Sequence, residues 1–391
     1  MQIIVKLTTG CNLNCVYCSE GDVARKDLSI ELLYKLIDDL PSLLDKCGDE
    51  NVDLLWHGGE PLLIGRKYLA EVMQYARNKL KKYNVHFLMQ TNGTLIDEEW
   101  IKLFKKYDIG IGISLDGYKE LHDKNRLTKN HQPTFDTVLN NIIKLKKNGI
   151  SVGTLMVLNT EEKVDADKLF EFIKQYDLQP KIHPVIPCGR AKKEAKEGID
   201  RIYDNYIDLM SELYKRIMQS DEKIIVEPLN EIMDAILGVA QIRECSFNGS
   251  CGKNFICLYA NGDVGFCGRA SSLNDGNLLY GNLQNSNLTD LYESANAERI
   301  RQRQSYLMNN DCKNCTDWSL CHGGCSFEAV NFWGRLNAGY PHCKLRKKLI
   351  HFLRTTGLEL LKQSLLKQKR QYRMQIKGKQ KLLEEIEYER E

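Results

Sequence analysis

The stretch Cys11-Asn-Leu-Asn-Cys15-Val-Tyr-Cys18 places three thiols directly after residues 3–7, an apolar segment that we predict to be a β-strand. In parallel α/β folds, the loops at the carboxyl ends of the strands carry the chemistry. Three thiolates can bind three irons of a 4Fe–4S cluster, whereas a closed electron-transfer cluster needs a fourth cysteine nearby. The spacing therefore favours a cluster with one open iron. A zinc site completed by a distant histidine, such as His57, is the alternative.

Composition limits the class of protein. The chain has 391 residues, of which 42% are hydrophobic and 27% charged, enough for one large domain and a smaller one. Its 14 cysteines are too small a fraction of the chain for a small protein stabilised by disulfides. They recur at the short spacings that are typical of metal ligands. No apolar run is long enough to span a membrane, and residues 1–10 lack a signal-peptide cleavage site. A net charge of +3 does not demand a nucleic-acid partner. We therefore expect a cytoplasmic protein that binds neither membrane nor nucleic acid.

The first half of the chain alternates strand-like and helical segments. The expected strands are residues 3–7, 52–56, 85–90, 110–115, 151–158 and 181–186, and the expected helices are 30–44, 68–81, 98–106, 135–147 and 166–176. Asp97 and Thr134 are expected to cap the helices that follow them. Such alternation predicts a parallel sheet with right-handed crossovers. Because six units fall short of the eight of a closed barrel, we predict an α/β fold, a partial (β/α)6 TIM-like barrel.

The pattern divides the chain into four segments. Residues 1–200 form the partial barrel, 201–244 linking helices, and 245–345 a cysteine-rich domain that bound metal helps to stabilise. Residues 346–391 are predicted to form a helical tail. From Lys344 to Glu391 the chain has 14 Lys and Arg against 6 Asp and Glu, a net of +8. The tail is either a solvated helix or a site that pairs with an acidic peptide.

Three more motifs follow the next three predicted strands in order. They are Gly58-Gly59-Glu60-Pro61, Gln90-Thr91-Asn92-Gly93 and Ser114-Leu115-Asp116-Gly117. Each alone is an ordinary turn sequence. Together with the cysteine loop they resemble the motifs of the radical S-adenosylmethionine (SAM) enzymes. Those enzymes use a reduced 4Fe–4S cluster to cleave SAM into methionine and a 5′-deoxyadenosyl radical, which takes a hydrogen atom from the substrate.

This resemblance implies a role for each matching residue. Cys11, Cys15 and Cys18 would hold the SAM-cleaving cluster. SAM itself would be bound by Tyr17 against the adenine, by Gly58, Gly59 and Glu60 at the amino group, by Ser114 at the ribose and by Arg126 at the carboxylate. The two glycines are expected because a side chain would block a close backbone approach.

The remaining cysteines have a second pattern. It runs Cys245-x5-Cys251-x15-Cys267, then Cys312-x2-Cys315-x5-Cys321-x3-Cys325-x17-Cys343. The pattern resembles the SPASM extension of radical SAM enzymes that modify peptides and proteins. That resemblance implies two auxiliary 4Fe–4S clusters, three clusters in all. The first would take Cys245, Cys251, Cys267 and Cys325, and the second Cys312, Cys315, Cys321 and Cys343. A zinc ribbon made by Cys312 and Cys315 with Cys321 and Cys325 is the alternative. We interpret Cys47, Cys188 and Cys257 as structural.

The layout is similar to that of the anaerobic sulfatase-maturating enzymes, which oxidise Ser or Cys to formylglycine. Those enzymes carry their general base, an Asp, directly after the cysteine equivalent to Cys267, whereas this chain has Gly268. We therefore predict a maturase that installs a thioether, C–C or C–O cross-link in a ribosomally made peptide. Sulfatase maturation, peptide epimerisation and a non-catalytic Fe–S or zinc scaffold are the alternatives, and the last has no use for a SAM pocket.

The predicted partners are a precursor peptide, a flavodoxin- or ferredoxin-type electron donor and a separate leader-binding protein. Asp116, at the end of the fourth predicted strand, is the candidate catalytic acid or base. His322 and Glu328, which neighbour the auxiliary cysteines, are weaker candidates. A lone Asp or His is more often a structural hydrogen-bonding group.

Overall fold

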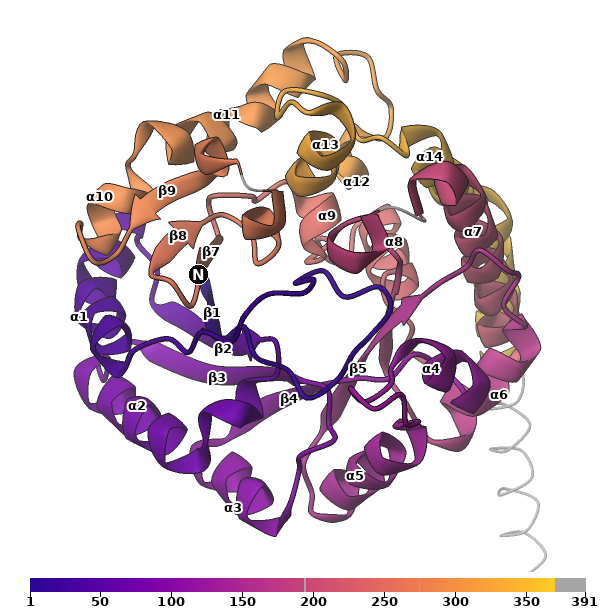
Figure 1. The fold of residues 1–391 in the computed structure, drawn as a ribbon. Coiled ribbons are helices and arrows are strands. Elements are labelled where there is room, and N and C mark those ends of the chain that lie inside the picture. Colours follow the sequence, from indigo (N-terminus) through magenta and orange to yellow (C-terminus); the bar gives the residue numbers. More distant parts are fainter. Residues whose placement is uncertain (193–194, 274, 370–391) are drawn as a thin grey trace, which may run out of the picture.

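One nine-stranded sheet is the framework of the molecule, seen in a computed structural model that describes residues 1–192, 195–273 and 275–369 (Figure 1). The strand order is β6-β5-β4-β3-β2-β1-β7-β8-β9. The strands are β1 Gln2–Thr8, β2 Asn51–Gly58, β3 Asn84–Thr91, β4 Ile109–Ser114, β5 Val152–Leu158, β6 Pro180–Pro184, β7 Phe255–Leu258, β8 Asp263–Gly265 and β9 Leu279–Asn282. Strands β1 to β6 are parallel, and β6 does not pair with β9 among the described residues. The predicted partial (β/α)6 barrel is confirmed.

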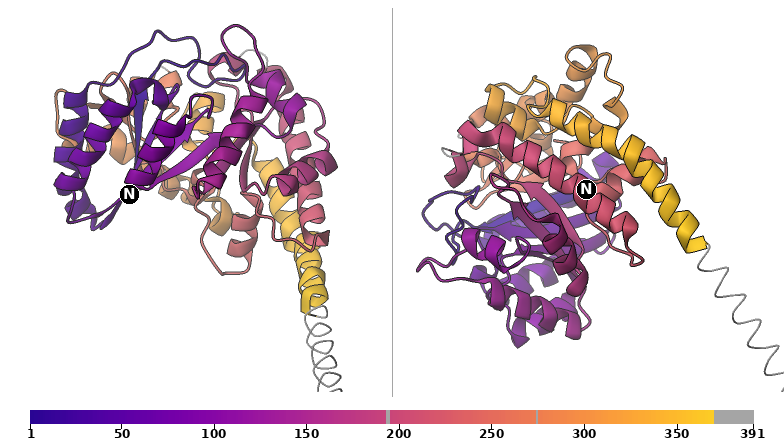
Figure 2. Two further views of the ribbon diagram at one scale, coloured as in Figure 1. Left: turned by 90° about the horizontal axis from the view of Figure 1, so that it is seen from below. Right: turned by 90° about the vertical axis from the view of Figure 1, so that its right-hand side faces the viewer.

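Amphipathic helices cover the outside of the parallel strands (Figures 1 and 2). They are α1 Ile30–Cys47, α2 Arg66–Lys79, α3 Glu98–Tyr107, α4 Lys119–Asn125, α5 Phe135–Lys147 and α6 Ala166–Gln175. In α3, Trp100 and Phe104 lie one turn apart and are both buried, and this stripe holds the helix on the sheet. The predicted strands and helices agree with these bounds to within three residues.

The two predicted caps differ in outcome. Asp97 accepts a hydrogen bond from the backbone N–H of Trp100, as predicted. The prediction for Thr134 was wrong, because its side chain makes no capping hydrogen bond. Asp123 takes that role instead, since its Oδ1 accepts from the N–H groups of Thr134 and Phe135 at 3.0 and 2.9 Å.

The cysteine-rich region extends the same sheet. Strand β7 pairs in parallel with β1, with Ile4 opposite Cys257, and β8 and β9 continue as an antiparallel meander. Cys257 is fully buried on β7. Between the two regions lie α7 Ala195–Gln219 and α8 Leu229–Ile236. The cysteine-rich region is therefore continuous with the barrel, and the boundaries at 200, 244 and 345 remain predictions.

Short helices make up most of the last third of the chain. They are α9 Cys245–Asn248, α10 Leu288–Tyr292, α11 Ala295–Asn309, α12 Trp318–Cys321, α13 Ser326–Trp333 and α14 Cys343–Phe352, with 3-10 turns at Pro61–Ile64, Gly189–Lys192, Ala270–Leu273 and Gly276–Leu278. A π-helical turn, Leu353–Gly357, follows α14.

Helix α14 packs along α7 and begins the predicted basic tail (Figure 2). Its inner face buries Leu349 and Ile350, and Leu353 is buried in the following turn. The part of the tail from 370 to 391 lies outside the described residues. No helix in the described ranges is long and apolar enough to cross a bilayer.

Candidate active site

The loop that joins β1 to α1 carries the first three cysteines across the end of the sheet, at the centre of the ring of helices (Figure 1). The backbone N–H of Leu13 lies 3.4 Å from Cys11 Sγ. Burial raises the pKa of Cys15 to about 11, and the neighbouring thiols Cys18 and Cys11 raise it further. The three side chains therefore share one small region, as a common cluster requires.

Backbone contacts from the far side of the barrel hold this loop. The guanidinium of Arg190 donates to Cys15 O at 2.9 Å, and the Arg190 N–H donates to Cys18 O at 3.0 Å. A Cβ on Gly189 would lie 2.1 Å from Cys18 O, so only glycine fits there. We did not predict Gly189 or Arg190 as part of the site, because their contacts to residues 15–18 span more than 170 positions.

The Gly58-Gly59-Glu60-Pro61 turn lies against the start of the same loop. The N–H of Gly59 donates to Thr8 O and that of Glu60 to Gly10 O, both at 2.8 Å. A Cβ on Gly59 would lie 2.3 Å from Gly10 O. The glycines are thus required by the close approach of two backbone segments, a reason that differs from the ligand approach expected above.

Glu60 is fully buried and braces this turn. Its carboxylate accepts hydrogen bonds from the N–H groups of Leu62 and Asn92 at 3.1 and 2.8 Å, and from the Thr91 hydroxyl at 2.7 Å. Burial raises its pKa, although the three donors oppose that rise. Its side chain therefore connects the second and third motifs.

Asp116, Arg126 and Tyr17 form a buried group beside Cys15. Arg126 Nε donates to Asp116 Oδ2 at 2.9 Å, the Tyr17 hydroxyl donates to the same oxygen, and the Val157 N–H donates to Oδ1 at 3.0 Å. The Arg126 guanidinium lies 5.4 Å from the centre of the Tyr17 ring, and its Nη1 lies 3.9 Å from Cys15 Sγ. Both oxygens of the fully buried Asp116 thus accept hydrogen bonds from within the barrel, an arrangement that suits a positioning group.

Ser114, the remaining SAM candidate, lies at the end of β4. Its hydroxyl accepts a hydrogen bond from Gln90 Nε2 at 3.0 Å, which ties the third and fourth motifs together. A Cβ on Gly112 would lie 2.4 Å from Gln90 Oε1. All four motifs thus meet at one end of the parallel strands.

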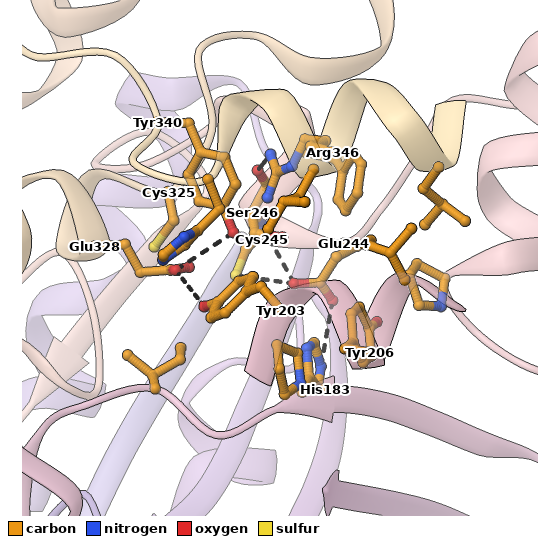
Figure 3. A pocket seen from close by; sticks show the side chains of 18 of the residues that line it. His183, Tyr203, Tyr206, Glu244, Cys245, Ser246, Cys325, Glu328, Tyr340 and Arg346 are labelled. Atoms are coloured by element: carbon orange, nitrogen blue, oxygen red, sulfur yellow. Dashed lines mark hydrogen bonds and ion pairs between the residues drawn. The ribbon is translucent and has the colours of Figure 1, made fainter. Parts of the chain in front are cut away.

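The first auxiliary set of cysteines surrounds the upper part of a cavity of about 90 Å³ (Figure 3). Cys245, Cys267 and Cys325 line it. Burial raises the pKa of Cys245 well above its ordinary value, and the thiols of Cys325, Cys251 and Cys267 raise it further. These four thiols, which come from three separate segments, are the four that the resemblance to the SPASM extension groups together.

The second auxiliary set lines a cavity of its own, of about 190 Å³. Its wall includes the four cysteines of that set: Cys312, Cys315, Cys321 and Cys343. The volume is far above the roughly 10–15 Å³ that holds one water molecule. In the described part of the chain, no group of three or more His, Cys, Asp or Glu side chains is arranged to hold a single metal ion. Four thiols around one such cavity match the donor set of a cluster. Cys325 lines the other cavity and not this one.

A turn of three left-handed residues separates the two sets. His322, Gly323 and Gly324 have φ of 48°, 82° and 70°, and they connect Cys321 to Cys325. A Cβ on Gly324 would lie 2.6 Å from Tyr340 Cβ. This turn directs two cysteines only four positions apart toward different cavities.

The weaker acid–base candidates have internal partners. His322 Nδ1 lies 2.8 Å from Phe247 O. Glu328 is buried and accepts hydrogen bonds from the hydroxyls of Tyr203 and Tyr340 at 2.7 and 3.3 Å, as Figure 3 shows. Cys188 is buried between the two regions, and burial raises its pKa to about 11.

The region around Gly268 has one buried ion pair. Lys6 Nζ lies 2.5 Å from Glu20 Oε1 and 3.5 Å from His57 Nδ1. A Cβ on Gly268 would lie 3.3 Å from Lys6 Cε. His57 Nδ1 accepts from the Gly58 N–H at 2.7 Å, so its partners are within the barrel and it is not placed as a ligand of the first three cysteines.

The comparisons with known proteins agree with this geometry. Residues 5–173 match the radical SAM superfamily, and residues 245–316 match the SPASM iron-sulfur cluster-binding domain. The chain therefore contains a radical SAM domain followed by a SPASM domain. This radical SAM chain is 26% identical over 335 residues to the cysteine-type anaerobic sulfatase-maturating enzyme of Clostridium novyi (strain NT), covering 83% of this chain and 87% of that one. It is 24% identical over 337 residues to the serine-type enzyme of Bacteroides thetaiotaomicron, covering 81% and 80%.

Solved structures show the same fold for this radical SAM chain. It is similar to anSMEcpe with bound AdoMet and the Cp18Cys peptide, with a TM-score of 0.76, 20% identity, and coverage of 93% of this chain and 98% of that one. It is also similar to SuiB of Streptococcus suis bound to its precursor peptide SuiA, with a TM-score of 0.60, 16% identity, and coverage of 84% and 72%.

The radical SAM and SPASM domains imply [4Fe–4S] clusters, including auxiliary ones, and SAM. When bound, these groups supply the electron and the radical. The residues described above provide thiols, a backbone cradle and a buried cation next to Cys15. The enzyme class expected from the motifs is confirmed.

Proposed function

We propose that this radical SAM enzyme installs a cross-link in a ribosomally made peptide. The proposal rests mainly on the glycine at position 268, directly after Cys267. By the resemblance stated above, sulfatase maturases have a carboxylate base at this position. Here no side chain is present, and the nearest group to a Cβ is Lys6, whose ammonium is already paired with Glu20. A cross-linking enzyme has no need for a base at that position.

The residue assignments are part of the proposal. Cys11, Cys15 and Cys18 hold the SAM-cleaving cluster, and the two auxiliary sets hold one cluster each. Tyr17, Gly58, Gly59, Glu60, Ser114 and Arg126 form the SAM site. Asp116 acts as a positioning residue, because it fixes both Arg126 and Tyr17.

A peptide substrate is supported by the relatives, since anSMEcpe and SuiB were both crystallised with bound peptides. We propose a one-electron donor of the flavodoxin or ferredoxin type, a separate leader-binding protein and a cytoplasmic location as the context of the reaction.

The test compares two peptides with anaerobically reconstituted enzyme, SAM and a low-potential reductant. One is a Cys-, Tyr- or Trp-bearing peptide encoded beside the gene, and the other is a sulfatase peptide with its target Cys. We expect 5′-deoxyadenosine and a precursor that has lost two hydrogen atoms, with the linked residues identified by fragmentation. The Cys15→Ala variant is the control and should form neither product.

Sulfatase maturation is the second candidate, because the sequence similarity to those enzymes covers more than four fifths of this chain. Formylglycine in the sulfatase peptide, together with an unchanged precursor, would establish it and overturn cross-linking. A precursor that gains a deuterium from solvent without losing mass would indicate epimerisation instead.

A further inference from the structure

Three arginines next to the auxiliary cysteines lack a carboxylate partner. They are Arg269, Arg303 and Arg346, and none forms an ion pair with Asp or Glu in the described part of the chain. Charged side chains are seldom buried without an opposite charge, because removing them from water is costly. Glu328 favours the charged form of Arg346 from a distance, together with Tyr340 and Cys321. For Arg269 and Arg303 the counter-charge must come from another group.

Arg303 binds the turn that connects Cys321 to Cys325, which line different cavities. It projects inward from α11 and is 3% exposed. Its guanidinium donates to four carbonyl oxygens, each at 2.9 Å: Leu336 O, Gly324 O, Gly323 O and Ala338 O. These carbonyls satisfy its hydrogen bonds but leave its charge uncompensated.

The groups that can offset this charge are cysteines of both sets in their thiolate form, the form that binds metal. Burial lowers the pKa of Arg303, and four cysteines oppose that effect: Cys251 and Cys325 of the first set, and Cys312 and Cys321 of the second. Two of the carbonyls that Arg303 binds belong to the left-handed turn between Cys321 and Cys325. The positive charge of Arg303 can therefore affect both sets of cysteines.

Arg346 lines both cavities, and the cysteine that it contacts, Cys321, belongs to the second set. Its Nη1 lies 3.6 Å from Cys321 Sγ and donates to Ser246 O at 2.6 Å. Its guanidinium lies 3.7 Å from the centre of the Tyr340 ring, next to which Figure 3 shows it. Arg269 belongs to the first site, where the thiols of Cys267, Cys325 and Cys245 favour its charged form and raise its pKa.

The cysteines of the SAM-cleaving site have a different environment. Two guanidinium groups lie near Cys15, those of Arg126 and Arg190. Arg126 forms an ion pair with the fully buried Asp116, and Arg190 forms one with Asp22. Both cations are therefore neutralised locally. The two kinds of site differ in net nearby charge, although both have an arginine close to a thiol.

A cluster becomes more negative by one charge when it is reduced, so a buried cation stabilises the reduced state. We infer that Arg303 is the shared counter-charge of the two auxiliary sites and raises the reduction potential of both, while Arg346, which contacts Cys321, raises chiefly that of the second site. The neutral Arg126–Asp116 pair leaves the SAM-cleaving site at a lower potential. The order of the reduction potentials does not depend on the substrate. Only the use of that order in oxidising a peptide rests on the proposed function.

The test is a potentiometric titration of the reconstituted full-length protein, followed by electron paramagnetic resonance, without substrate. Arg303→Gln should lower the midpoint potentials of both auxiliary signals and leave the SAM-cleaving signal in place. Arg303→Lys keeps the charge and should remain close to the wild type. Arg299→Gln, an exposed residue on the same helix, is the matched control and should change nothing.

Unchanged auxiliary potentials in fully loaded Arg303→Gln protein would overturn the inference. If that variant does not bind its full iron, Arg346→Gln decides the matter. A downward shift of one auxiliary signal supports the electrostatic role, and unchanged potentials in that variant defeat it. Because no peptide is used, this result is independent of whether the cross-linking proposal succeeds.

Discussion

Arg126 and Asp116 form a buried ion pair of 2.9 Å beside the Cys15 thiol, ten positions apart in the chain. Their side chains are 9% and 0% exposed. The pair therefore acts as one neutral unit, which fixes the Tyr17 ring and places one guanidinium next to the first cysteine loop.

Breaking this pair should affect both stability and chemistry. Asp116→Asn leaves a buried guanidinium without a counter-charge, and we expect a loss of about 3–5 kcal/mol in the free energy of unfolding together with slow 5′-deoxyadenosine formation. Glu99→Gln, which removes the exposed pair with Lys102, should cost at most about 1 kcal/mol. Denaturant unfolding and SAM cleavage measure the two effects, and equal losses in both variants would contradict the assignment.

A methyl group at Gly59 should disrupt the active-site end of the sheet. Its Cβ would lie 2.3 Å from Gly10 O, so the cysteine loop must shift. We expect Gly59→Ala to reduce SAM cleavage and to lower the iron content from about 12 toward about 8 per chain. Gly276→Ala has nothing within 4 Å of its Cβ and should behave as wild type. Full iron and activity in Gly59→Ala would refute this explanation.

The left-handed turn after Cys321 should be needed by both auxiliary sites. Gly324→Ala adds a Cβ 2.6 Å from the Tyr340 side chain, at a φ of 70°. We expect the iron content to fall toward about 4 per chain, with SAM cleavage retained. Gly334→Ala is the control, because Gly334 has a similar φ of 65° but no atom within 4 Å of the added Cβ. Its cost in stability measures the backbone conformation alone, about 1 kcal/mol. Iron loss in both variants would point to the conformation alone.

His122 should make stability depend on pH. Burial lowers its pKa to about 4, while Asp116 and Asp123 oppose the shift and Arg126 and Lys119 add to it. The unfolded chain, with a histidine pKa near 6.5, binds the extra proton first, so this contribution is full above about pH 6.5 and is lost as the pH falls toward 4. Its size is at most about 3 kcal/mol.

Thermal unfolding at about pH 7.5 and about pH 5.5 tests this dependence. The difference between the two melting temperatures should be smaller in His122→Gln than in the wild type. His86→Gln alters an exposed histidine on β3 and should keep the full difference. The same pH response in the His122 variant would show that other groups account for it.

The order of the strands and helices was predictable because each element has its own local pattern. The Phe135–Lys147 helix, for example, shows an unbroken apolar stripe in the sequence and has the predicted bounds. The grouping of the auxiliary cysteines also followed from spacing and resemblance. The pairing of β7 with β1 was not predictable, because a four-residue strand carries too little pattern to identify its partner.

The polar contacts of the site were harder to predict than its motifs. Arg303 sits in a polar helix with no local feature that marks it as buried, and its four carbonyl partners come from two later loops. Asp123 displaced Thr134 as a cap because a side chain from the preceding helix reaches the same N–H groups. Such contacts depend on the assembled fold rather than on neighbouring residues.

Because β1 pairs in parallel with β7, one edge of β1 has no partner during synthesis until β7 has been made. About 250 residues separate the two strands, and at roughly 5–20 residues per second a ribosome needs on the order of 10–50 s to produce them. During that time the outer edge of β1 has unpaired N–H and C=O groups, which can attach to other strands. The first strand made is thus among the last to be paired on both of its edges.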